Sequence, residues 1–127
     1  MQMVERVHQM IETYVTEGDV AVDATVGNGW DTLKLCQQVG KSGKVYGFDI
    51  QEDALNKTKE RLKEEGVLER AELLCCSHAF AQNYIKEPIK IFVMNLGYLP
   101  GGQKDIVTCK DSTIEALRSF LSIFCFC

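Results

Sequence analysis

The chain has 127 residues, of which 46% are hydrophobic and 25% are charged, and its formal net charge is −4. This length and composition are typical of one folded domain that buries about two-thirds of its unfolded surface, and they exclude a disordered chain. The negative net charge excludes a general attraction to nucleic acid, so any contact with RNA needs a local patch. We therefore expect a single domain over residues 1–127.

The cysteine pattern argues against a metal site. Six cysteines are present, but no two form a C-x-x-C pair, and only two histidines are available as further ligands. Cys75 and Cys76 lie in an apolar run, where we expect them to behave as small buried hydrophobic side chains. No secretory signal precedes the domain, and no apolar stretch reaches the roughly 18 residues of a membrane span. We expect a reduced, cytoplasmic protein with no metal ion and no membrane segment.

The first segment shows helical spacing of apolar residues, which predicts a helix that ends at Gly18. His8 lies on or beside the apolar stripe of this helix. For His8 we expect a role in packing or hydrogen bonding rather than in catalysis.

The central motif is an apolar strand over residues 20–22 that ends in Asp23, followed by Gly27 and Gly29 and then by a helix that ends at Gly40. The glycines let the backbone turn sharply and come close to a ligand. Exposed amides at the start of a helix favour a negative group, so this loop is a candidate ligand site. A glycine turn required only for packing is the alternative.

A second strand, predicted over Lys44–Asp49, ends in another acid. Asp49 lies about twenty residues beyond the glycine loop, at the spacing where nucleotide-binding folds place an acid that accepts hydrogen bonds from ribose hydroxyls. Its carboxylate is not required for packing or turning, which favours ribose binding. The alternative is an N-cap for the amphipathic helix that we expect over residues 51–65.

Two further strands complete the predicted sheet. The third covers residues 71–76, and Ser77 and His78 follow it on the rim that carries the glycine loop; His78 either contacts a ligand or is a loop residue without function. A short helix over residues 79–84 precedes the fourth strand, residues 89–94, and a polar loop extends from Asn95 to Lys104. Residues 112–115 form a capping box that starts a last helix.

These motifs together resemble the S-adenosylmethionine-dependent methyltransferases. Asp23-Ala-Thr-Val-Gly-Asn-Gly, Phe48-Asp-Ile-Gln, Ser77-His78 and Asn95-Leu-Gly-Tyr-Leu-Pro-Gly-Gly are similar to a small bacterial family labelled putative rRNA methylases. Characterised members of that family are tRNA methyltransferases that act on the aminomethyl group of a modified wobble uridine. Trp30 departs from the family pattern, which commonly has histidine there.

The resemblance implies an α/β, Rossmann-like class I methyltransferase fold, with parallel strands in the order 3-2-1-4 and flanking helices. It also implies an incomplete domain, truncated at the C-terminus, whose C-terminal strands are missing. The fourth strand is apolar on both faces and would then form an unprotected edge. We expect this edge to be covered by the last six residues, by a second copy in a homodimer, or by a missing C-terminal half.

The resemblance also implies roles for the site residues, with S-adenosylmethionine as cofactor and tRNA as substrate. Asn95 orients the substrate amine and Tyr98 stacks on a base. The cofactor contacts are Asp23 near the ammonium, Asn28 and Asp31 at the methionine portion, Asp49 and Gln51 at the ribose, and Ser77 and His78 at the adenosine end, with Gly27 and Gly29 forming the loop. One alternative is a cofactor-binding protein without activity. The other is a nicotinamide-dependent oxidoreductase, which Thr32 disfavours because it occupies the position of the third glycine of a dinucleotide fingerprint.

Overall fold

The computed structural model describes the backbone of residues 3–96 and 103–112 and the side chains of residues 6–94. Every helix and strand predicted before Asn95 is present, although the first helix ends at Tyr14, before the predicted Gly18. In chain order the elements are α1 (Met3–Tyr14), β1 (Val20–Asp23), α2 (Trp30–Val39), β2 (Lys44–Asp49), α3 (Glu52–Glu64), the 3-10 helix η1 (Leu68–Arg70), β3 (Ala71–Cys75), the 3-10 helix η2 (His78–Asn83), β4 (Ile89–Leu96) and β5 (Gln103–Ser112).

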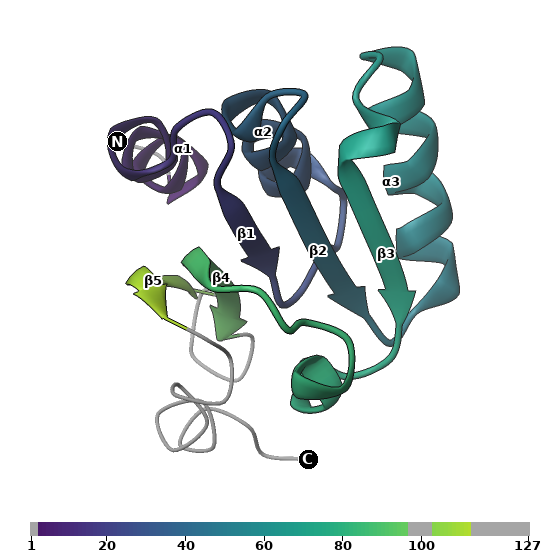
Figure 1. Cartoon of the computed structure of the whole chain (residues 1–127). Helices are drawn as coiled ribbons and strands as arrows, with labels where there is room; N and C mark the ends of the chain where they lie inside the picture. The colour runs from purple at the N-terminus through teal and green to yellow at the C-terminus, as the bar shows by residue number, and fades with distance from the viewer. Residues whose placement is uncertain (1–2, 97–102, 113–127) are drawn as a thin grey trace.

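The strands form one sheet in the order β3-β2-β1-β4-β5. The first four are parallel, and this confirms the predicted order 3-2-1-4 and the Rossmann-like α/β fold. Figure 1 shows the arrowheads of β1, β2 and β3 at one end of the sheet, with η2 close to the same end. The segments that follow these strands are therefore brought together.

The fourth strand is not the edge that the sequence predicts. β5 pairs with β4 in antiparallel register, with Phe92 opposite Val107 and Asn95 opposite Lys104. The predicted loop from Asn95 to Lys104 is therefore shorter, since both ends lie in strands. This pairing gives the backbone of β4 a partner on its outer side, so the reason for expecting a homodimer at that edge is removed. Tyr98 and the predicted last helix lie outside the described residues, apart from Ser112, which ends β5.

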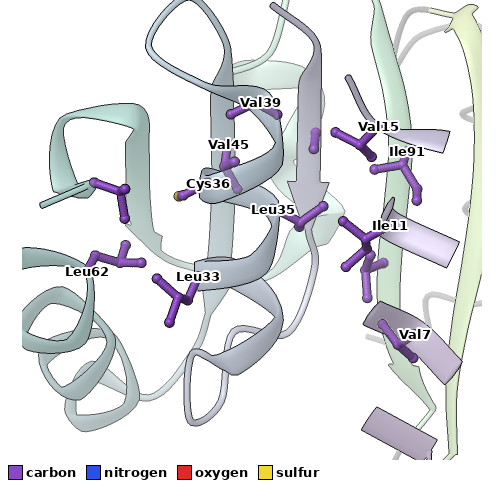
Figure 2. Packing of buried hydrophobic residues seen from close by; sticks show 13 residues of the cluster. Val7, Ile11, Val15, Leu33, Leu35, Cys36, Val39, Val45, Leu62 and Ile91 are labelled. Carbon is purple, nitrogen blue, oxygen red and sulfur yellow. The ribbon is translucent and has the colours of Figure 1, made fainter. Parts of the chain in front are cut away.

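The core lies on both faces of the sheet because successive side chains of a strand point to opposite faces. On one face, α1, α2 and α3 pack against Ala21, Val45, Ile91 and Val93, and Figure 2 shows part of this cluster. The other face carries a second cluster with contributions from η2 and the turn after it; its members are Val22, Ala24, Tyr46, Phe48, Ala81, Ile85, Ile89, Phe92 and Met94. None of the helices within residues 3–96 and 103–112 is long and apolar enough to cross a membrane.

The burial of Cys75 and Cys76 differs from the expectation that both are buried. Cys36 is the fully buried one, and burial raises the pKa of its thiol to about 12, so that it is a neutral core side chain. Cys75, predicted to be buried, is exposed, and Cys76 is half-buried. The reason is that β3 is an edge strand of the sheet and Cys75 is its last residue.

Candidate functional site

The strand register brings the predicted acids to one end of the sheet. Asp23 at the end of β1 lies opposite Gly47 of β2 and Val93 of β4, and Asp49 at the end of β2 lies opposite Cys75. Asn95 follows Val93 by two positions in β4, so its backbone lies at the same end; its side chain is outside the described part. We call this end, with the loop between β1 and α2, the carboxyl rim.

The carboxylate of Asp49 joins the glycine loop to the end of β2. Its Oδ2 accepts a hydrogen bond from the backbone N–H of Gly27 at 2.9 Å, and its Oδ1 accepts one from the N–H of Gln51, also at 2.9 Å. The expectation that this side chain is not required for turning is wrong, because it binds the backbone on both sides. The N-cap position of α3 is Gln51 rather than Asp49. Because each carboxylate oxygen has two lone pairs, Asp49 can still accept hydrogen bonds from a ligand.

Asp23 holds the same loop from inside the molecule. Its side chain is buried, its Oδ2 accepts a hydrogen bond from the hydroxyl of Thr32 at 2.7 Å, and its Oδ1 accepts one from the N–H of Thr25 at 3.2 Å. Thr32 lies in the first turn of α2 and is itself fully buried. Sequence reasoning missed this role of Thr32, although a hydroxyl where a dinucleotide fold requires glycine was the available signal.

Gly29 lets α3 pack directly against the loop. Its φ of 85° lies in the left-handed region, and a Cβ added to it would lie 2.5 Å from Oγ1 of Thr58, a buried residue of α3. Only glycine has both the conformational freedom and the small volume that this position requires. The loop is therefore enclosed by β2 on one side and by α3 on the other.

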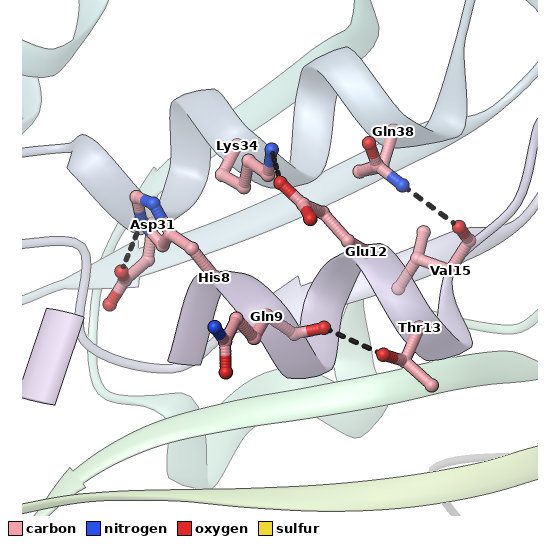
Figure 3. A network of polar contacts seen from close by, with 8 residues as sticks. All are labelled: His8, Gln9, Glu12, Thr13, Val15, Asp31, Lys34 and Gln38. Atoms are coloured by element: carbon pink, nitrogen blue, oxygen red, sulfur yellow. Dashed lines mark hydrogen bonds and ion pairs between the residues drawn. The ribbon is translucent and has the colours of Figure 1, made fainter. Parts of the chain in front are cut away.

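The acid next to this loop, Asp31, faces α1. Its carboxylate is 1% exposed and lies 3.0 Å from Nε2 of His8. Figure 3 shows this contact beside the ion pair of Glu12 with Lys34, which also joins α1 to α2. His8 thus has the hydrogen-bonding role expected from the sequence. For Asp31, the structure shows a side chain directed toward His8, and the predicted ligand contact remains a prediction.

His78 carries a polar atom that has no partner among the described residues. Its Nε2 is buried without a hydrogen bond, and its ring meets Phe92 edge to face at a centroid distance of 6.2 Å. Burial lowers the pKa of the imidazole, which favours the neutral form. The neighbouring Ser77 caps η2, because its Oγ accepts a hydrogen bond from the N–H of Ala79 at 3.1 Å.

An exposed apolar side chain completes the rim. Ile50 directly follows Asp49 and, at 75%, is the most exposed large hydrophobic residue among the described side chains. Ile50 is not among the site residues expected from the sequence, although an isoleucine after a strand-end acid was the available signal. Among the side chains of residues 6–94, no group of three His, Cys, Asp or Glu is placed to hold a metal ion.

Comparison with known proteins gives one family match. The sequence profile of the family described as "Putative rRNA methylase" matches residues 45–125, which is more than half of the chain. A tRNA (mnm5s2U34)-methyltransferase from the chloroplast of Arabidopsis thaliana is 37% identical over 125 residues, which are 91% of this chain and 46% of the plant protein. The chain thus spans about half the length of this curated relative.

Two solved structures have the same fold. A protein from Streptococcus mutans described as "a putative methyltransferase", in complex with SAH, gives a TM-score of 0.70 at 32% identity, over 97% of this chain and 65% of that one. A protein from Clostridium thermocellum described as a "putative rRNA-methylase" gives a TM-score of 0.70 at 29% identity, over 75% of this chain and 69% of that one. The fold implied by the motifs is therefore confirmed.

Replacing Thr32 with valine should destabilise the chain. The substitution keeps the shape of the side chain but removes the hydroxyl that donates to the buried carboxylate of Asp23. We expect a loss of about 1–3 kcal/mol in the free energy of unfolding, measured by urea denaturation. Thr32→Ser, which keeps the hydroxyl, is the matched control. A valine variant as stable as the parent would contradict this account of the loop.

His78 should make stability depend on pH. Burial lowers the pKa of His78 in the folded state below the ordinary value of 6.5. Below about pH 6.5 the unfolded state therefore binds a proton more readily than the folded state, and this lowers the free energy of unfolding. Relative to a His78→Gln variant, the chain should lose stability as the pH falls below about 6.5, by less than about 1.4 kcal/mol per pH unit. Urea denaturation at a series of pH values measures the difference. A difference that stays constant on acidification would show that the imidazole is not held neutral.

Proposed function

The chain belongs to the Putative rRNA methylase family, and from this premise we propose that it is an S-adenosylmethionine-dependent methyltransferase. The observation that carries the proposal is the joining of Asp49 to Gly27, which places an acid and a glycine loop together on the carboxyl rim. The SAH bound to the Streptococcus mutans relative supports the choice of cofactor. When bound, the cofactor would supply a methyl group to an amine: the sulfur–methyl bond would break as the nitrogen–methyl bond forms, SAH would leave, and the amine would release one proton, with no covalent nucleophile on the protein.

The polar groups of the rim fit the parts of this cofactor. Asp49 has lone pairs for ribose hydroxyls, and Gln51 lies beside it. The amides at the start of α2 suit a carboxylate, while the negative charge of Asp23 favours the ammonium. In the proposed site, Asn28 and Asp31 belong to the methionine end. The buried Nε2 of His78, with Ser77, forms the polar part of the adenosine end, and the exposed Ile50 offers an apolar surface for the base.

The contact of Thr32 with Asp23 disfavours a nicotinamide dinucleotide. A dinucleotide fold uses its third glycine for close packing of helix on strand, and an acid four residues before the first glycine is not part of that fingerprint. Here the corresponding residue is a buried threonine that binds this acid at 2.7 Å. The loop is therefore built around a carboxylate, which suits a ligand that carries an ammonium better than one that carries a pyrophosphate.

We further propose that the substrate is tRNA, and that the methyl group goes to the aminomethyl nitrogen of a modified wobble uridine. The plant relative named for this base supports the substrate. Asn95 lies at the rim by the register of β4, where its amide oxygen would accept a hydrogen bond from the amine and orient its lone pair. Tyr98 would stack on the base. Orienting the amine is the main task of these residues.

Asp49→Ala should weaken cofactor binding. Loss of a charged acceptor at the ribose and release of Gly27 should reduce the affinity for S-adenosylmethionine by about tenfold or more, measured by calorimetric titration. Glu72→Ala removes an exposed carboxylate from β3 and is the control. Unchanged affinity in Asp49→Ala would remove the ribose assignment. Thermal stabilisation by NADH in place of S-adenosylmethionine would favour the oxidoreductase.

Asn95→Ala should separate turnover from cofactor affinity. We expect methyl transfer to tRNA carrying the aminomethyl uridine to fall by about 100-fold, because the amine loses its orienting acceptor, while cofactor affinity changes little. Transfer of a labelled methyl group measures turnover, and tRNA without the aminomethyl group is the control. Equal losses of turnover and affinity would contradict the placement of Asn95. Cofactor binding by the parent without any methyl transfer would show a binding protein without activity.

A further inference from the structure

Helix α3 binds both carbonyl groups at the tip of the glycine loop. The hydroxyl of Thr58 donates to the carbonyl oxygen of Gly27 at 3.4 Å, and Nε of Arg61 donates to the carbonyl oxygen of Asn28 at 3.0 Å. Thr58 is buried and Arg61 is half-buried. The carbonyl groups of the loop therefore face α3. The Gly27 amide, which donates to Asp49, lies on the side of the loop that faces the carboxyl rim.

Arg61 also stacks on the first residue of α2. Its guanidinium carbon lies 3.6 Å from the centroid of the Trp30 ring, which is within the range of a cation–π contact. The indole is 50% exposed, so this stacking does not serve to bury it in the core. One side chain of α3 thus binds the loop at Asn28 and the start of α2 at Trp30.

We propose that Arg61 is a positioning residue for the cofactor site, acting through Asn28 and Trp30 without touching the ligand. This inference rests on the proposed function. The two contacts restrain a loop whose glycines would otherwise leave it many conformations, and a loop that is already ordered loses less entropy when a ligand binds. Trp30, which departs from the family pattern, then has a role in this chain: it gives the guanidinium a flat surface to lie on.

Arg61 is not needed to hold α3 on the sheet. Leu55, Thr58 and Leu62 are the buried residues of this helix, and Leu62 belongs to the cluster beneath it. A residue that served only stability would change the melting temperature and the affinity together. A positioning residue changes affinity while the melting temperature stays almost constant, because the contacts of Arg61 lie at the surface.

The test is a titration of SAH into the chain and its variants by calorimetry, with the melting temperature measured alongside. Arg61→Ala should weaken SAH binding by about tenfold, because SAH must then order about one more residue of the loop when it binds, and should shift the melting temperature by less than about 4 °C. Arg61→Lys, which keeps the charge and one donor, should recover part of the affinity. Lys59→Ala removes an exposed positive charge from the same helix and should bind as the parent does.

A second readout needs no ligand. Trp30 is the only tryptophan of the chain, so its fluorescence reports on the stacked pair alone. Arg61→Ala should make Trp30 more accessible to quenching by acrylamide, and Lys59→Ala should not.

Three results would overturn the inference. One is equal SAH affinity in Arg61→Ala and the parent, and another is an equal loss in Arg61→Ala and Lys59→Ala. The third is a parent that does not bind SAH, which would show instead that the proposed function itself is wrong.

Discussion

The hydrogen bond from the Gly27 amide to the Asp49 carboxylate is the constraint on which the site depends. The loop after β1 contains two glycines with positive φ. Because glycine has no side chain, packing at these two positions does not restrain the backbone of the loop. Asp49, at the end of β2, restrains the loop instead, because its Oδ2 accepts a hydrogen bond from the Gly27 N–H at 2.9 Å. Asp23, buried beneath the loop and bound to Thr32, supplies a second restraint. The shape of the loop is therefore set by two neighbouring strands of the sheet.

Both acids have structural partners in the absence of a ligand, and this affects how the site would work. Two carboxylates lie on one rim, and each accepts hydrogen bonds from backbone N–H groups or from the hydroxyl of Thr32. The rim is therefore negative and already ordered, which suits a cationic ligand and lowers the entropy lost on binding. Helix α1 extends this ordering through the contact of His8 with Asp31.

Most of the fold could be predicted from the sequence, because the patterns that indicate it each lie within one short segment of the chain. Strands buried on both faces read as apolar runs, and their end acids and the glycines mark the rim. β5 was missed because an edge strand gains its stability from pairing with β4 rather than from its own sequence. The structural role of Asp49 was missed for a related reason. Its contact with Gly27 joins residues 22 positions apart in the chain, and only the register of β1 on β2 brings them together.

The most direct test of this account is the exchange rate of the Gly27 amide hydrogen, measured by NMR in the ligand-free chain. If Asp49 holds the loop before any ligand binds, this amide is protected, the protection is lost in Asp49→Ala, and the amide of Val22 within β1 remains protected in both. Exchange of the parent's Gly27 amide at the rate of an unstructured chain would contradict the account.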